Sequence, residues 1–126
     1  MNFYHVLYVG IGGAVGSMAR YLTIKGIDEK MLSSFPYGTL VVNVTGSLIL
    51  GFLMGFTLNR PGNREELKLF IGTGICGGFT TFSTFASENF FLLHEKPVFS
   101  LLYMGFSLLL GVAAVGLGYF AGKSIA

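Results

Sequence analysis

Four long apolar segments alternate with short polar connections along the chain. They run approximately from Phe3 to Thr23, from Tyr37 to Leu58, from Leu67 to Leu93 and from Val98 to Gly122. A helix that crosses the ~30 Å hydrocarbon core of a membrane needs about 20 mostly apolar residues, and each segment has that length. The pattern therefore predicts an all-helical membrane protein, in which residues 1–126 form a single domain of four transmembrane helices.

The composition supports this prediction and excludes several function classes. Of the 126 residues, 52% are hydrophobic and only 11% are charged, whereas soluble domains are roughly 25% charged. The single cysteine, Cys76, cannot form an internal disulfide, and the net charge of +2 includes no basic run. We therefore expect neither a soluble enzyme, nor a disulfide scaffold, nor a nucleic-acid-binding protein.

The basic residues are divided evenly between the two predicted membrane sides. One side carries Arg60, Arg64, Lys68 and Lys123, and the other carries Arg20, Lys25, Lys30 and Lys96. Because orientation follows the Lys/Arg bias across short loops, four against four gives no preferred orientation. We therefore expect the chain to insert both ways. Two opposite copies would then form a homodimer with the symmetry of an inverted repeat.

Small residues recur at four-residue spacing in three of the segments. They are Gly12 and Gly16 in the first, Ser47, Gly51 and Gly55 in the second, and Ala114, Gly118 and Gly122 in the fourth. Such spacing lets helix backbones approach closely in a membrane. It indicates where helices pack and carries no chemistry of its own.

The third segment contains the most informative sequence, GTGICGGFTTFSTFASE at residues 72–88. Gly77 and Gly78 lie near the middle of this segment and precede several hydroxyl residues, which weaken a helix. We predict a helix break at these glycines, near the membrane midplane. Freed carbonyl groups there could hold a cation, and half-helix N-termini attract anions. The alternative is a simple kink that serves packing.

Beyond the break, helical spacing separates polar from aromatic side chains. One face carries Thr80, Thr81, Thr84 and Glu88. Phe79 and Phe82 lie opposite, with Phe85 between the two groups. The positive edge of a phenyl ring can contact an anion without trapping it, although such residues also commonly face lipid or the protein core.

Further polar residues lie in the other segments. The second segment has a stripe of Thr39, Asn43 and Ser47, and the fourth has Tyr103 and Ser107. These side chains could replace the water of a dehydrating anion, or could simply link helices. Ionisable residues deep in the predicted spans are few, and Arg20 and Glu88 are the candidates. Arg20 is either a vestibule charge or a snorkelling side chain, and Glu88 is either a proton-binding carboxylate or a helix-to-helix hydrogen-bond partner.

In this order, these residues resemble the bacterial fluoride channel family (Fluc, also called CrcB). The resemblance rests on residues 12–20, on GTLVVNVTGSLILG at 38–51 and above all on GGFTTFSTF at 77–85. It implies a dual-topology antiparallel homodimer in the bacterial inner membrane. It also implies two fluoride pores along the subunit interface and a structural sodium ion (Na+) at the centre.

The resemblance also implies roles for individual residues. Backbone carbonyls of Gly77 and Thr80 would hold the sodium, and Phe82 and Phe85 would line the pores through their ring edges. Asn43 would donate to fluoride. The remaining expected positions are Ser83 and Thr84 in a polar track, Arg20 and Thr39 at a vestibule, Tyr103 and Ser107 at the pore by their spacing, and Thr81 and Glu88 as further members of the track.

We therefore expect a passive fluoride channel that exports fluoride from the cytoplasm. A proton-coupled fluoride antiporter that uses Glu88 is the closest alternative. A small multidrug exporter of four-span, dual-topology type would need a carboxylate in the first span and an aromatic cage with tryptophan. The first span has no carboxylate, and the chain has no Trp. A non-transporting assembly subunit is a further alternative.

Overall fold

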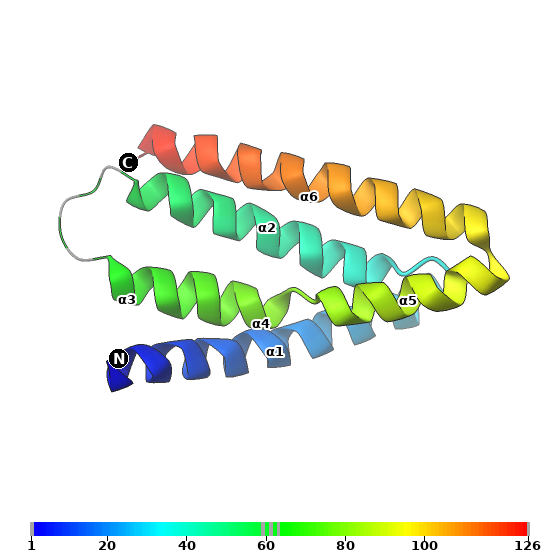
Figure 1. The fold of residues 1–126 in the computed structure, drawn as a ribbon, viewed down its shortest axis with the longest axis horizontal. Coiled ribbons are helices and arrows are strands. Elements are labelled where there is room, and N and C mark those ends of the chain that lie inside the picture. The colour runs from blue at the N-terminus through cyan, green and yellow to red at the C-terminus, as the bar shows by residue number, and fades with distance from the viewer. Residues whose placement is uncertain (1, 59, 61, 63, 126) are drawn as a thin grey trace.

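The computed structural model describes residues 2–58, 60, 62 and 64–125, and the regular secondary structure in that part of the chain is entirely helical. The elements are α1 (Phe3–Met31), α2 (Tyr37–Thr57), α3 (Glu65–Leu67), η1 (Lys68–Cys76), α4 (Gly77–Phe79), α5 (Phe82–Glu95) and α6 (Pro97–Ile125). The elements from α3 to α5 follow one line. Figure 1 shows this line, α1, α2 and α6 as four antiparallel rods, with both chain ends at the same end of the bundle.

Three stretches of the described chain are long and apolar enough to cross a membrane: Tyr37–Thr57, Glu65–Glu95 and Pro97–Ile125. The predicted membrane character of these three is thus confirmed. Helix α1 has 29 residues, a length of ~44 Å at 1.5 Å per residue. It is not among the three stretches, and glycines, Arg20 and the charges after Thr23 interrupt its apolar residues.

Helix α1 extends beyond its predicted end. The sequence predicts an end near Thr23 and a polar connection from Lys25 to Pro36, but the helix continues to Met31. Leu32 ends it in the left-handed conformation, with φ at 47°, and its N–H donates to the Asp28 carbonyl at 3.2 Å. The prediction is wrong because charged residues end an apolar segment without ending a helix, which needs a backbone cap.

Glycines hold two helix pairs in close contact, as the small-residue spacing predicted. A methyl group added at Gly51 of α2 would collide with the Val115 carbonyl oxygen of α6. One added at Gly16 of α1 would collide with the Ile75 carbonyl oxygen of η1. The same backbone-to-backbone approach occurs at Gly12, Gly55, Gly118 and Gly122. The prediction that these stripes serve packing is confirmed.

The line from α3 to α5 is interrupted, but not at the predicted glycines. Gly77 and Gly78 are helical, and α4 ends at Phe79. Thr80 and Thr81 are both extended, with ψ of 157° and 117°, before α5 begins at Phe82. The predicted position is therefore wrong. Gly78 instead packs against α1, where an added methyl would lie 3.1 Å from the Gly13 Cα.

Segment η1 is a π-helix, which the sequence did not predict. The Gly77 N–H that follows it donates to the carbonyl of Gly72, five residues earlier, as in a π-helical turn. Its wider turn buries Gly72, Gly74 and Cys76. Positions in η1 therefore depart from the faces that the 3.6-residue period of an α-helix assigns.

Candidate functional site

The side chain of Asn43 in α2 hydrogen-bonds to the backbone of the interruption, which consists of Thr80 and Thr81. Its Nδ2 donates to the Thr81 carbonyl at 3.2 Å, and its Oδ1 accepts from the Thr81 N–H at 2.8 Å. The Thr81 hydroxyl also caps α5 by accepting from the Thr84 N–H at 3.3 Å. The backbone of Thr81 therefore has partners without being helical, which removes much of the cost of an interruption inside an apolar bundle.

Two carbonyl groups lose the donors that a continuous α-helix would give them. The Gly77 carbonyl would accept from Thr81 and the Thr80 carbonyl from Thr84, but both N–H groups donate to side chains instead. Gly77 and Thr80 also line the same cavity. Freed carbonyl oxygens at unwound helix segments are typical sodium ligands, so these two residues fit the predicted role.

A cavity of about 570 Å³ lies beside the interruption. Its walls come from α2, η1, α4, the interruption, α5 and α6, and none of its lining side chains is charged. The lining residues are Asn43, Gly46, Ser47, Leu50, Gly72, Cys76, Gly77, Thr80, Thr81, Phe82, Phe85, Met104, Ser107, Leu108 and Gly111. An uncharged cavity with a few polar groups suits a small ion that must also leave again.

Two phenyl rings form one wall of this cavity. The centroids of Phe82 and Phe85 lie 5.9 Å apart, with the rings tilted by 39°. Phe85 is half-buried and its centroid lies 5.0 Å from that of Tyr103. Phe82, in contrast, is 79% exposed. The ring of Phe82 therefore faces outward, where a second molecule or lipid can cover it.

The two predicted pore residues of α6 behave differently. Tyr103 is completely buried and its hydroxyl donates to Glu88 Oε1 at 2.9 Å, so it supports the wall and does not line the cavity. Ser107 lines the cavity, and its buried hydroxyl has no hydrogen-bond partner within the described chain. Because a buried hydroxyl normally has a partner, Ser107 is suited to bind a ligand in the cavity.

Glu88 links three helices. Besides Tyr103 of α6, its carboxylate accepts from the Thr39 hydroxyl of α2 at 3.0 Å. Thr39 is completely buried and its short side chain points to Glu88, while its place at a vestibule stays a prediction. Of the two alternatives for Glu88, the geometry favours the helix-to-helix hydrogen-bond partner.

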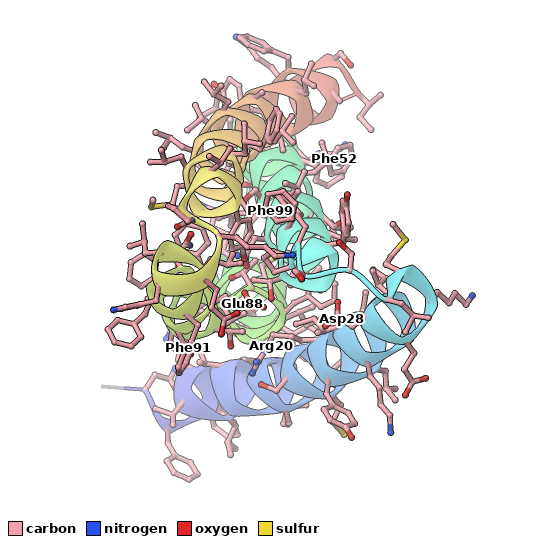
Figure 2. All side chains as sticks on the ribbon, turned by 90° about the vertical axis from the view of Figure 1, so that its right-hand side faces the viewer. Arg20, Asp28, Phe52, Glu88, Phe91 and Phe99 are labelled. Atoms are coloured by element: carbon pink, nitrogen blue, oxygen red, sulfur yellow. The ribbon has the colours of Figure 1, made fainter. Side chains whose placement is uncertain are left out.

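Arg20 is directed toward the interruption. Its Nε donates to the Gly78 carbonyl at 2.9 Å. In Figure 2, which looks along the helices, Arg20 lies on the side of α1 that faces the other helices. The guanidinium therefore belongs to the surroundings of the interruption, and the snorkelling alternative does not describe its geometry.

The predicted polar face is only partly present. Thr80 and Thr81 precede α5, so they do not share its helical spacing, while Thr84 and Glu88 do. Neither Ser83, which is exposed, nor Thr84 is among the cavity-lining residues. Sequence reasoning also missed Asn89, whose amide accepts from Ser100 at 2.8 Å and donates to the Phe85 carbonyl at 2.9 Å. An amide residue inside an apolar segment, one position after Glu88, was the available signal in the sequence.

Known proteins carry the same sequence pattern. A family model described as "CrcB-like protein, Camphor Resistance (CrcB)" matches residues 7–119. The chain belongs to the CrcB family. It is 37% identical over 121 residues to the fluoride-specific ion channel FluC of Flavobacterium psychrophilum, covering 95% of this chain and 98% of the relative. It is 43% identical over 118 residues to FluC of Rhizobium meliloti, covering 93% and 89%. It is 42% identical over 123 residues to FluC of Bacteroides fragilis, covering 94% and 95%.

Membership of the CrcB family settles the general class of the protein. The family consists of ion channels and not of enzymes. Together with the apolar helices, it makes this chain a multi-pass bacterial membrane protein, consistent with the inner membrane. The predicted resemblance to the fluoride channel family is confirmed.

Proposed function

We propose that this protein is a passive, fluoride-selective channel that exports fluoride from the cytoplasm. The observation that carries the proposal is the uncharged cavity beside the interruption, where phenyl rings, an amide and an unpartnered hydroxyl meet. The names of the relatives supply the ion: each of the three is called a fluoride-specific ion channel.

The cavity offers weak donors in place of water. Ser107 supplies a hydroxyl that has no partner among the residues the structure describes. Asn43 has a second Nδ2 hydrogen beyond the one given to Thr81. The positive edges of Phe82 and Phe85 add contacts that carry no full charge. Since no lysine or arginine lines the cavity, fluoride can be dehydrated there without being trapped, which conduction requires.

A second, antiparallel copy would complete the pathway. Phe82 lines the cavity yet is 79% exposed, so a single chain leaves this wall uncovered. The four-to-four division of basic residues gives neither orientation an advantage. In the resulting homodimer, the two copies of the cavity would form two pores related by the two-fold axis.

Carbonyl groups of Gly77 and Thr80, from both copies, would hold a structural sodium ion. Their helical donors are diverted to Asn43 and to the Thr81 hydroxyl, which leaves the oxygens available. A bound sodium ion would supply positive charge that stabilises the non-helical backbone at the centre of the dimer. It would have no part in moving fluoride.

The direction of transport follows from acid–base chemistry and the membrane potential. HF crosses the membrane as a neutral acid and dissociates at the higher internal pH. A negative interior then drives the anion outward, with about 2.3 kcal/mol per elementary charge for each 100 mV. Proton-coupled exchange through Glu88 has less support, because both carboxylate oxygens accept hydrogen bonds from Thr39 and Tyr103 and Glu88 is not among the cavity-lining residues.

Reconstituted liposomes test the proposal. We expect rapid fluoride efflux and no comparable chloride efflux, measured with ion-selective electrodes in the presence of valinomycin and a potassium gradient. Purification without sodium should reduce the active fraction, and adding sodium back should restore it. Equal efflux of both anions, or none from folded protein, would refute the proposed function. Sodium-independent efflux would refute only the sodium site.

A further inference from the structure

We infer that Phe35, in the connection between α1 and α2, positions the pore-wall ring of Phe85 by acting through Tyr103. The inference rests on the proposed function only for its transport readout. Phe35 lies 50 residues before Phe85 in sequence and is not among the cavity-lining residues. A series of ring contacts nevertheless joins the two, from the connection at one end of the bundle to the cavity wall.

The first step is the fixed backbone of Phe35. Its N–H donates to the Ser33 hydroxyl at 3.1 Å, and its carbonyl accepts from the Tyr37 N–H at 2.9 Å. Lys96, at the junction of α5 and α6, donates to the Ser34 hydroxyl at 3.0 Å. The connection is therefore attached to the start of α2 and to the junction of α5 and α6, which fixes the backbone position of Phe35.

The second step is the ring of Phe35, which is directed inward. Its centroid lies 4.8 Å from that of Tyr37, 6.1 Å from that of Phe99 and 5.5 Å from that of Tyr103. The planes of Phe35 and Tyr103 are inclined by 69°, which is the favourable edge-to-face arrangement. Phe35 thus packs against Tyr103 from the end of the bundle at which α1 and α2 are connected.

The third step is Tyr103, which contacts rings on both sides. Its centroid lies 5.5 Å from that of Phe35 and 5.0 Å from that of Phe85. It has no exposed surface, and its hydroxyl is held by Glu88 at 2.9 Å. If the Phe35 ring is removed, the ring of Tyr103 gains space on one side only. Its shift would take away the support on which Phe85 rests, because closely packed interiors transmit such displacements.

A spectroscopic measurement tests this without relying on transport. We would incorporate 4-fluorophenylalanine at position 85 and record ¹⁹F NMR spectra of the assembled protein. Phe35→Ala should shift or broaden the resonance. Phe35→Tyr, which keeps the ring, should give a resonance close to that of the wild type. The matched control is Phe52→Ala, because Phe52 stacks on Phe56 at 5.9 Å near the end of α2 that is far from Phe35. If Phe35→Ala fails to fold, Phe35→Leu removes the ring and keeps most of the apolar volume.

Fluoride efflux provides the second readout. Phe35→Ala should reduce efflux by about two- to tenfold, the size expected for one lost aromatic contact, while Phe52→Ala should not. An unchanged resonance in Phe35→Ala would overturn the inference, and so would normal efflux from that variant when the wild type conducts. If the wild type does not conduct fluoride, the proposed function is refuted, and the ¹⁹F resonance alone tests the role of Phe35.

Discussion

Two regions of this bundle are held together in different ways. The contacts of α1 with η1 and of α2 with α6 are backbone against backbone, at glycines whose Cβ position is already occupied by a neighbouring carbonyl. The contacts of α5 are made instead by side chains, through Glu88 to Thr39 and Tyr103, through Asn89 to Ser100 and through the ring of Phe85 to Tyr103. The interruption at Thr80 and Thr81 lies between the two regions.

The difference shows how the protein can be rigid and still build an ion site. Close glycine packing fixes the helix positions through many van der Waals contacts and leaves no space for a ligand at the glycine contacts themselves. Hydrogen-bonded helices can stand further apart. Phe82 and Phe85 of α5 form one wall of the cavity, and its other walls come from α2, η1, α4, the interruption and α6. Substitutions in the first region should therefore affect folding, and substitutions in the second should mainly affect transport.

The largest effect is expected from Gly51→Val in the glycine-packed region. The added side chain would collide with the Val115 carbonyl oxygen, and overpacking of this kind costs about 3 kcal/mol or more when backbones must separate. We expect loss of the folded protein in size-exclusion chromatography and thermal unfolding. Gly116→Val is the matched control, because nothing lies within 4 Å of its added Cβ. Equal losses in both variants would contradict the role of close packing.

Asn43→Ala should have the next largest effect and should separate transport from folding. It removes both partners of the Thr81 backbone, and leaving such groups unpaired costs about 1–3 kcal/mol. We expect an assembled dimer with a lower unfolding temperature and fluoride efflux reduced by about tenfold or more, as a barrier increase of 1.4 kcal/mol would produce. Thr57→Ala on the same helix, whose hydroxyl bonds to Leu53 within α2, should leave efflux normal. Normal fluoride efflux from Asn43→Ala would show that the Asn43 side chain is not part of the fluoride pathway.

Phe82→Ala should affect transport with little effect on the stability of the single chain. The ring is 79% exposed, so little packing is lost, but one cavity wall disappears. Efflux should fall by several-fold while the unfolding temperature stays near that of the wild type. Phe90→Ala is the control, because Phe90 is an exposed ring of the same helix that does not line the cavity. An equal loss of efflux in both variants would mean that exposed rings of α5 matter only for assembly.

Glu88→Gln should have the smallest effect. The amide keeps one acceptor oxygen and replaces the other by an NH2 group, which can donate to the oxygen of a hydroxyl. The hydrogen bonds to Thr39 and Tyr103 thus become neutral ones, at a cost of about 1 kcal/mol. We expect a slightly lower unfolding temperature and fluoride efflux that remains independent of a pH gradient. If the variant instead loses transport while remaining folded, the carboxylate has a role in conduction beyond linking helices.

Much of the fold could be predicted because its causes are local. The apolar segments of α2, of the line from α3 to α5 and of α6 follow directly from the thickness of a membrane. The glycine stripes follow from the need for close helix contact. The position of the interruption could not be predicted in the same way. It depends on the side chain of Asn43, which lies 38 residues before Thr81 in sequence. Gly77 and Gly78 have a lower helix propensity than their neighbours. The contact of Gly78 with α1 nevertheless keeps this part of the chain helical.

The candidate site shows the same limit. Hydroxyl, amide and aromatic residues could be identified as pore candidates from their type and spacing. Their geometry depended on distant partners: Thr39 is buried because it meets Glu88, 49 residues later in sequence. Tyr103 and Ser107 are one helical turn apart, yet only Ser107 lines the cavity. The π-helical turn of η1 has no clear signal in the sequence.

A current measurement in a planar bilayer tests the central claim most directly. With a tenfold fluoride gradient, equal chloride on both sides and an imposed pH difference, a passive fluoride channel predicts a current that reverses at the fluoride equilibrium potential, about 59 mV for a single charge. Changing the pH difference should leave that potential unchanged. A reversal potential that follows the pH gradient, or fluoride transport without any current, would contradict a passive channel.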